Sequence, residues 1–303
     1  MTKKILLIPH LKIHNANALS SPYTIGFPAM TAWLGAVHAL ERKLKITKVY
    51  DGEEYREYED LYFSSMAVAC HDINLQTYKG DFVHSIIGTG NPLDKTGKRP
   101  SFIEEARCHL DVSIIVEFET EEDSQDLSSD IADLLQGSMK IAGGDILSCD
   151  YDKIETMEIN DTGEVRKLMG KLMPSHCLIE RRDLMQEAME KGQDAIDALL
   201  DYLAIHHHCE VEKTENQEKV TWSSQRKTKG WIVPIATGFQ GISELAKAEN
   251  QRDEKTQHRF AESIVTLGQF VMPYRITDLD NMLWEYHTDL ENNLYQCQQK
   301  THN

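Results

Sequence analysis

The sequence contains no run of about 18 apolar residues, and it therefore predicts no transmembrane helix. The apolar run of its charged start, MTKKILLIPH, stops at Pro9, which is too early for a signal peptide. The six cysteines form no C-x-x-C pair and have no regular spacing, which favours reduced, mostly buried thiols over disulfides or a zinc framework. These absences predict a cytoplasmic protein with no membrane partner.

Sequence motifs of catalysis are also missing. There is no H-E-x-x-H, nucleophile elbow, Walker loop or supported D-x-D cluster. His14, His38 and His109 can transfer protons, but His38 lies in an apolar stretch and is expected to be a core histidine. The adjacent histidines of residues 206–208 point in different directions, which favours a surface tract over a metal site. The residues thus predict a binding protein with no catalytic residue, no metal site and no cofactor.

Positive charge is scarce, with 32 basic against 49 acidic residues and a formal net charge of −17. This balance argues against a generic nucleic-acid binder. The distribution is uneven, however, because residues 1–50 hold seven basic residues and one acidic residue. Residues 219–231 are also basic, and acid is concentrated in 51–60 and 117–133, which are expected to be solvated faces. Such a chain can bind RNA on its basic side if a fixed partner shares the contact.

The first third of the chain is organised around a polar segment between an apolar strand and an apolar helix. Residues 3–13 predict a strand, and residues 14–27 predict a loop of short, hydrogen-bonding side chains. Pro28 suits the first turn of a helix. The helix is indicated by one stripe of large apolar residues at helical spacing, made of Met30, Trp33, Leu34, Val37, Leu40 and Leu44.

Further elements follow in an order that indicates the fold. Residues 61–78 and 110–118 predict strands, the second with one face in the core, and residues 124–138 predict a helix. Residues 139–147 predict a strand interrupted by Gly143 and Gly144, as a bulge or a close backbone approach requires. The order strand, helix, strand, strand, helix, strand is that of a ferredoxin-like α+β core.

The rest of the chain is divided into an insertion and a closing segment. Residues 1–149 and 230–303 are predicted to form the core, and 150–229 an inserted region with a helix at 184–205 and a polar loop at 210–229. The closing segment predicts a strand from Trp231, turns at Gly238 and Gly241, and a final helix containing Trp284. Both tryptophans are expected in the core.

Several sequence blocks together resemble a known family. They are N-A-N-A-x-S-S-P-x-T-x-G-F-P from residue 15, G-x-V-H-A-L-x-R from residue 35, I-E-E-x-R-x-H-L-x-V-S from residue 103, A-G-G-x-I-L from residue 142, and R-D-x-x-T-x-x-R-F-x-E from residue 252. The combination is similar to the second Csy subunit, a Cas-five-like, repeat-associated RNA-binding member of the type I-F CRISPR surveillance complex.

The resemblance implies a ferredoxin-like core with a helical or hairpin thumb, and a non-catalytic subunit that binds the 5′ handle of the guide RNA. It also implies pairing with the large Csy subunit, contact with the backbone Csy subunit, and at most indirect contact with target DNA. Asparagine amides can pair with base edges, and serine hydroxyls with phosphate. The predicted RNA-binding residues are Asn15, Asn17, Ser20, Ser21, Thr24, Gly26, Phe27, Arg107, His109, Gly143, Gly144, Arg252 and Arg259.

Alternative interpretations remain open from the residues alone. The short polar side chains of residues 15–24 can cap the loop and the helix, and Arg252 and Arg259 can form surface salt bridges. The whole chain can also be a metal-independent endoribonuclease that processes guide precursors, or a protein-only scaffold subunit.

Overall fold

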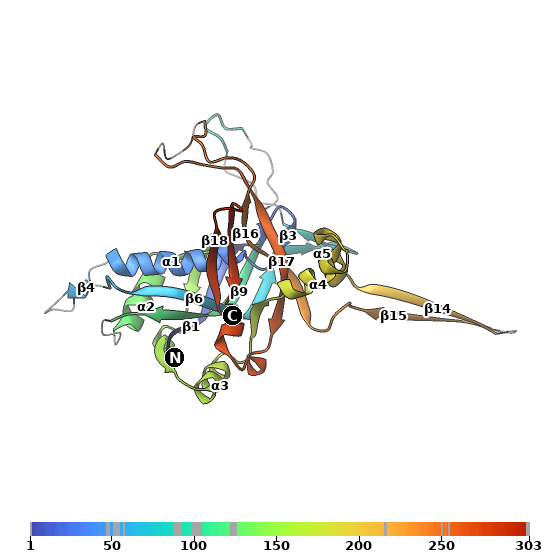
Figure 1. Cartoon of the computed structure of the whole chain (residues 1–303), viewed down its shortest axis with the longest axis horizontal. Coiled ribbons are helices and arrows are strands. Elements are labelled where there is room, and N and C mark those ends of the chain that lie inside the picture. The colour runs from blue at the N-terminus through green and yellow to red at the C-terminus, as the bar shows by residue number, and fades with distance from the viewer. Residues whose placement is uncertain are drawn as a thin grey trace.

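The computed structural model describes residues 2–46, 49–50, 55–56, 58–87, 93–98, 105–121, 126–214, 217–249, 251, 253 and 255–300 (Figure 1). Among these residues, no helix is long and apolar enough to cross a membrane. The architecture is α+β, and a large antiparallel sheet dominates it.

An 11-stranded sheet, counted over the described residues, runs in the order β10-β11-β1-β9-β6-β13-β17-β16-β19-β18, with β12 paired to β1. Its strands are β1 (Lys3–Asn17), β6 (Tyr62–Leu75), β9 (Arg107–Glu119), β10 (Lys140–Ile141), β11 (Gly144–Ser148), β12 (Glu155–Ile159), β13 (His176–Glu180), β16 (Trp231–Gly241), β17 (Ala261–Val271), β18 (Trp284–Asp289) and β19 (Leu294–Gln299).

Helices cover both faces of the half of the sheet built on β1, β9 and β6. On one face, α1 (Met30–Ile46) and α2 (Leu127–Gly137) bury the large side chains of their apolar stripes against the strands. On the other face, α3 (Thr162–Lys171) packs on a smaller cluster. The centre of β9 is therefore buried on both faces, which corrects the expectation of a single buried face.

The other half of the sheet curls back on itself. Trp284 at the start of β18 pairs with Met66 of β6, so the strands from β6 to β18 close into a ring. Helices α4 (Arg182–Glu190) and α5 (Ala195–Leu203) pack on β16 and β17 with a cluster of their own. Short 3₁₀ turns, η1 (Tyr151–Lys153), η2 (Pro273–Arg275) and η3 (Leu279–Asn281), join the strands.

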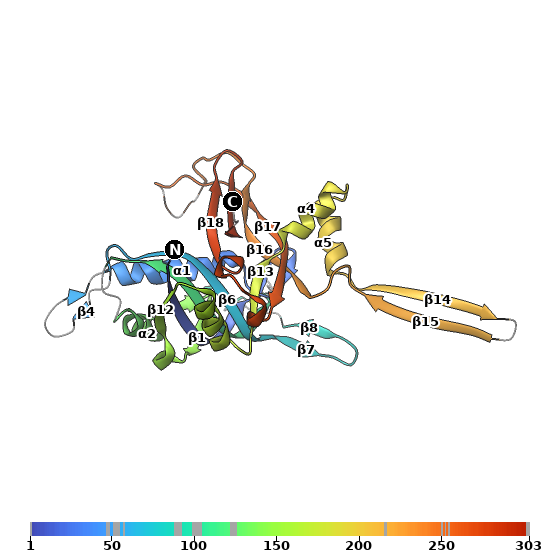
Figure 2. The same cartoon turned by 60° about the horizontal axis from the view of Figure 1, so that its bottom comes forward.

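Two-stranded hairpins lie outside the main sheet. The hairpin of β14 (His206–Thr214) and β15 (Gln217–Gln225) projects far from the body in Figures 1 and 2. The hairpin of β7 (Thr77–Lys79) and β8 (His84–Ile86) extends the end of β6 (Figure 2). The remaining small pairs are β2 (Leu19–Ser21) with β3 (Thr24–Ile25), and β4 (Val49–Tyr50) with β5 (Tyr55–Arg56).

Several predicted elements are confirmed. The strand at 3–13, the helix after Pro28, and the strands and helix between residues 61 and 138 are present, and Trp284 is fully buried. All six cysteines lie in the described part of the chain as free thiols, and Cys209 is the exposed one. The predicted division into a core (1–149 and 230–303) and an insertion (150–229) stays a prediction, although β12 and β13 of the inserted range join the main sheet.

Other predicted elements are wrong, mostly where a polar stretch predicts a loop. Residues 14–17 continue β1, and the expected polar loop at 210–229 contains part of the β14–β15 hairpin, because backbone pairing can hold a polar strand. The expected helix at 184–205 is two helices with Gly192, at φ +95°, between them. The expected closing helix is η3 followed by β18.

Further corrections concern four single residues. Gly238 lies inside β16, not in a turn, and glycine is needed there because a side chain would meet the backbone of β19. Gly241 ends the same strand. Trp231 is 46% exposed because it lies at the start of β16, and His38 is exposed on the outer side of α1 instead of in the core.

Candidate functional site

A groove of about 610 Å³ lies between α1, the end of β1 and the β10–β11 hairpin. Along one wall, α1 and the residues before it present only small side chains. Because these side chains are short, an open space remains beside the helix. The opposite side of α1 carries the large buried residues, so the helix is anchored by one face and open on the other. The small wall consists of Pro28, Ala29, Ala32, Gly35, Ala36 and Ala39.

Four of the predicted RNA-binding residues line this groove: Asn17, Ser20, Arg107 and Gly143. They come from β1, β2, β9 and the turn between β10 and β11. The sheet brings them together because Asn17 is the register partner of Arg107, and the amide N–H of Asn17 donates to Ala142 O at 2.8 Å. The site therefore depends on pairing between segments about 90 and 125 residues apart.

Two cations point into the groove, and each has a carboxylate partner. Arg107 forms an ion pair with Glu105 and also donates to Asn15 O at 3.3 Å. Lys140 forms an ion pair of 2.5 Å with Asp145, and the Lys140 ammonium lowers the pKa of Asp145 from its ordinary value. Both pairs are accessible to solvent, so a phosphate group can compete for the two cations.

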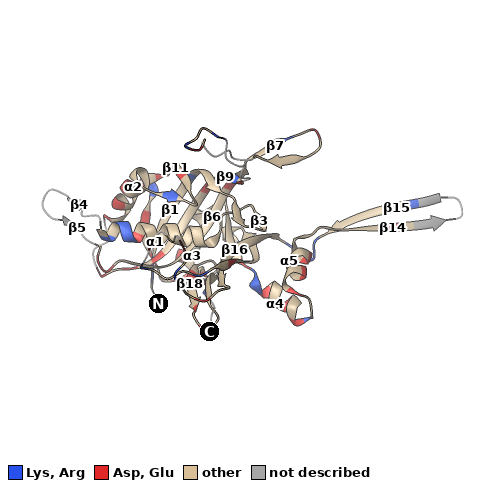
Figure 3. Ribbon diagram, turned by 90° about the horizontal axis from the view of Figure 1, so that it is seen from above, with Lys and Arg blue, Asp and Glu red and all other residues tan. Residues whose placement is uncertain are grey.

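The N-terminal end of α1 borders the same groove. Pro28, Ala29 and Ala32 line it, and the first turn of the helix contains no acidic residue. Unpaired amide groups and the helix dipole make such an end favourable for anions. Lysines gather at the opposite end of α1, where Lys43 and Lys45 occupy the last turn (Figure 3).

A polar cluster lies beside Arg107 on the sheet face opposite α1. The side chain of Asn15 accepts a hydrogen bond from Gln76, and Gln76 Nε2 lies 3.1 Å from His109 Nε2. His109 stacks on His14 with ring centroids 4.4 Å apart. Asn15 has φ +58°, a conformation that asparagine tolerates better than most residues. Asn15 and His109 thus lie next to the groove without lining it.

The predicted hydroxyl residues bond mainly to one another. Ser20 and Ser21 lie 2.8 and 2.7 Å from the Thr24 hydroxyl oxygen, and Tyr23 N donates to Ser21 Oγ. Asn17 Oδ1 accepts from Leu19 N at 2.9 Å. Ser21 and Thr24 are buried, so these side chains fix the β2–β3 hairpin, and Ser20 is the hydroxyl that faces the groove.

The remaining predicted residues lie elsewhere. Phe27 is buried, and its ring stacks on Trp33 at 5.2 Å. Gly26 N donates to Ala18 O, which turns the chain toward α1. Gly144 is covered by β1, and a side chain there would meet His14 O at 2.7 Å. Arg259 binds Asn293 away from the groove, and Arg252 lies outside the described residues.

Sequence reasoning missed part of the groove. The small-residue wall of α1 was visible as alanines and a glycine spaced three or four apart on the side opposite the large stripe. Lys140 had no sequence signal, and Glu105 was visible only as a member of the block that starts at residue 103, because the pairing of β1 with β9 and β11 places both residues here.

Comparison with known proteins agrees with the resemblance in the sequence. The family model described as CRISPR-associated protein (Cas_Csy2) matches residues 6–297. The CRISPR-associated protein Csy2 of Pseudomonas aeruginosa (strain UCBPP-PA14) is 30% identical over 318 residues, which cover 96% of this chain and 94% of that protein. The chain belongs to the Csy2 family of CRISPR-associated proteins.

Proposed function

We propose that this chain is a non-catalytic subunit of a type I-F Csy complex and that it holds the 5′ handle of the guide RNA in the groove beside α1. The observation that carries the proposal is the convergence of Asn17, Ser20, Arg107 and Gly143 on one groove. These residues belong to sequence blocks far apart in the chain that resemble the family, and the fold gathers them in one place.

The chemistry of the groove suits a single RNA strand. Arg107 and Lys140 supply cations for phosphates, and the open N-terminal end of α1 adds backbone donors. Asn17 and Ser20 supply polar groups for base edges or the 2′-hydroxyl. The turn of Ala142 and Gly143, both with positive φ, brings backbone close to the groove without a bulky side chain.

The proposal extends to the fold and the partners. The strand order β11-β1-β9-β6 with α1 and α2 on one face supports a ferredoxin-like core, and the projecting β14–β15 hairpin supports a thumb. The acidic surfaces would face the large Csy subunit and the backbone Csy subunit in the cytoplasm, with target DNA contacted at most indirectly.

Guide retention in the assembled complex tests the groove. We expect the double variant Arg107→Ala, Lys140→Ala to fold normally and to lose guide RNA when the complex is purified. The matched control is Lys153→Ala, Lys191→Ala, which removes two exposed lysines that are also ion-paired but lie outside the groove. Normal guide retention by the groove variant, or equal loss by the control, would refute the assignment of this groove.

Incubation of the purified chain with repeat RNA tests the non-catalytic part. We expect binding without cleavage, weak for the chain alone and strong in the presence of the other subunits. Cleavage would favour an endoribonuclease, and the stacked pair of His14 and His109 would then be the first residues to substitute. Absence of RNA contact in every assembly would favour a protein-only scaffold.

A further inference from the structure

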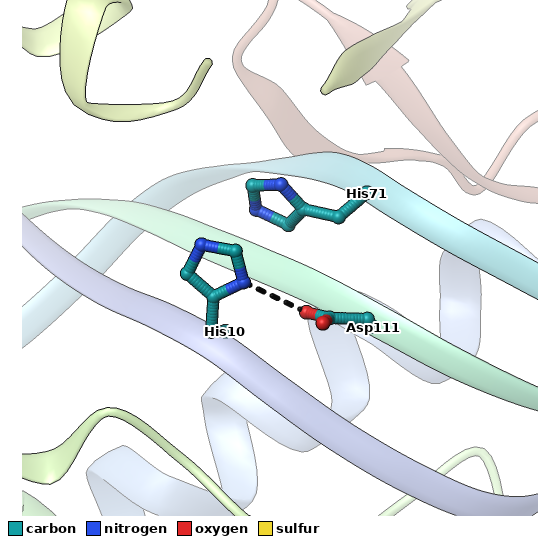
Figure 4. Close-up of side chains that lie close together, drawn as sticks. All are labelled: His10, His71 and Asp111. Carbon is teal, nitrogen blue, oxygen red and sulfur yellow. Dashed lines mark hydrogen bonds and ion pairs between the residues drawn. The ribbon is translucent and has the colours of Figure 1, made fainter. Parts of the chain in front are cut away.

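A second histidine pair lies on the sheet face opposite α1, outside the groove. His10 of β1 and His71 of β6 stack with ring centroids 4.0 Å apart, and Asp111 of β9 lies beside them (Figure 4). One nitrogen of each imidazole and one oxygen of Asp111 lie within 4.8 Å of one another. All three residues are half-buried, so a small ion can reach them.

Both histidines occupy irregular positions in their strands. The register of β1 with β9 shifts between Ile8 and Leu11, and His10 within this bulge has φ +50°. The register of β6 with β9 shifts between Cys70 and Asp72, and His71 is the residue between them. Bulges turn a side chain away from the regular alternation and are frequent beside functional sites. Here the bulges bring His10 of β1 and His71 of β6 toward Asp111 of β9, the strand that lies between them.

Hydrogen bonds orient both imidazoles. His71 Nδ1 donates to Pro174 O at 2.8 Å, which leaves Nε2 as the acceptor, 2.7 Å from Ser113 Oγ. His10 Nδ1 lies 3.0 Å from Asp111 Oδ1. The carbonyl of Pro174 thus holds the nitrogen of His71 that would not bind a metal, which is the usual support of a metal-binding histidine because it fixes the tautomer and the ring orientation.

The surroundings also suit a cation. A hollow of about 530 Å³ opens beside His10, and Asp150 and Asp152 line it. Lys153 and Lys171 line it as well, but they are paired with Asp150 and Glu155 and leave the hollow without an excess of positive charge. The three carboxylates of the hollow outnumber its two lysines, so its charge does not oppose a divalent cation.

We propose that His10, His71 and Asp111 bind one divalent transition-metal ion, which we assign as Zn²⁺ because two imidazoles and one carboxylate are ligands typical of zinc sites. The ion takes the place of the hydrogen between His10 Nδ1 and Asp111 Oδ1, and that hydrogen moves to His10 Nε2. His71 Nε2 becomes the third ligand when Ser113 turns its hydroxyl away. Ligands about 2.1 Å from a tetrahedral ion lie about 3.4 Å from one another. His10 Nδ1 and Asp111 Oδ1, now 3.0 Å apart, therefore separate slightly, and the His71 nitrogen, which lies within 4.8 Å of them, moves closer by rotation of its side chain. Three protein ligands leave a position open for water or an incoming group.

The test must exclude metal binding by the exposed histidine tract, residues 206–208, at the base of the β14–β15 hairpin. The chain used is therefore the variant His206→Ala, His207→Ala, His208→Ala, Cys209→Ala, titrated with Zn²⁺ by calorimetry and with Co²⁺ by visible absorption. We expect one metal ion per chain and Co²⁺ bands typical of a site with nitrogen ligands. Adding His71→Ala or Asp111→Asn should each weaken binding by more than about 100-fold.

The matched control is His14→Ala, which disrupts the other stacked imidazole pair on the same sheet face and should leave metal affinity unchanged. Asp111→Asn keeps the shape and a hydrogen bond of the carboxylate, so it remains informative if His71→Ala fails to fold. Absence of metal binding in the tract-free chain would overturn the site. The site would also be overturned if the His71→Ala and Asp111→Asn variants bound the metal as tightly as the tract-free chain. These metal-binding results do not depend on whether the groove beside α1 retains guide RNA.

Discussion

At the scale of single residues, Gly144 lies where the groove hairpin approaches β1 closely. A Cβ atom there would lie 2.7 Å from His14 O and 2.8 Å from Ala16 N, both of which belong to a paired strand that cannot move away. We expect Gly144→Ala to lower the free energy of unfolding by about 1–3 kcal/mol.

Gly137→Ala is the matched control for this prediction. Gly137 is the last residue of α2, and no neighbour lies within 4 Å of the position of its added Cβ. Urea unfolding should show that Gly137→Ala is neutral or slightly stabilising. Equal stability of the two variants would mean that β11 does not approach β1 as closely as described.

Glu117 predicts a pH dependence of stability. Burial opposes its charge, but hydrogen bonds from Lys300 at 2.5 Å and Ser65 at 2.8 Å, together with the charge of Lys3, outweigh burial and lower its pKa from the ordinary value of 4.5. Its contribution to stability is therefore complete above about pH 4.5 and is lost as pH falls through the lower folded-state pKa.

The variant Glu117→Gln checks this dependence by unfolding at a series of pH values. We expect a loss of about 1.5–3 kcal/mol at pH 7, as for a buried hydrogen bond to a charged group. Below pH 4.5 its stability should approach that of the original chain. A constant difference between the two proteins over this range would contradict the assigned pKa shift.

At the scale of elements, α1 connects stability and function because one side of the helix packs in the core and the other side lines the groove. Trp33 is fully buried and Leu40 nearly so, in the cluster that joins α1 to the sheet. We expect Trp33→Ala and Leu40→Ala each to destabilise by about 2–5 kcal/mol, because the cavity left in a packed core does not refill. Thermal melting measures the effect.

His38→Ala is the control on the same helix, since His38 is exposed. Its effect should stay within about 0.5 kcal/mol. Melting temperatures that are unchanged in both core variants would show that α1 is not anchored by this side, and the groove on its other side would then lose its rigid wall.

At the scale of the whole molecule, the net charge of −17 opposes approach to a phosphate backbone. In addition, the two cations of the groove, Arg107 and Lys140, already form ion pairs with Glu105 and Asp145. We expect the isolated chain to bind guide RNA weakly and with a shallow salt dependence, and to bind well once a partner subunit covers acidic surface and adds cations.

Salt-titrated binding of the chain alone and of the chain with its large-subunit partner measures this difference. Nanomolar binding of arbitrary RNA by the chain alone would contradict it. The control is an unrelated single-stranded RNA of equal length. A handle-specific groove should bind this RNA more weakly than guide RNA when the partner subunit is present, and the chain alone should not distinguish the two.

The sequence determined most of the elements in the first half of the chain. The apolar stripe of α1 and the runs in β1, β6 and β9 are local patterns, and local patterns suffice where one residue period dominates. The blocks that resemble the family also lie within short stretches, so the family could be recognised without the fold. Polar strands such as β14 and β15 could not be predicted, because backbone pairing stabilises them instead of an apolar pattern.

The tertiary structure alone decided which residues meet. Arg107, Lys140 and Asn17 share a groove because pairing within one sheet brings the ends of β9 and β1 and the β10–β11 hairpin together. His10, His71 and Asp111 meet because β1 and β6, which flank β9, each have a bulge at the same level. It also showed that Phe27 belongs to the core and Trp231 does not. The physical reason is that strand pairing is non-local: contacts between residues 40 to 130 positions apart follow from register and twist, which no window of sequence contains.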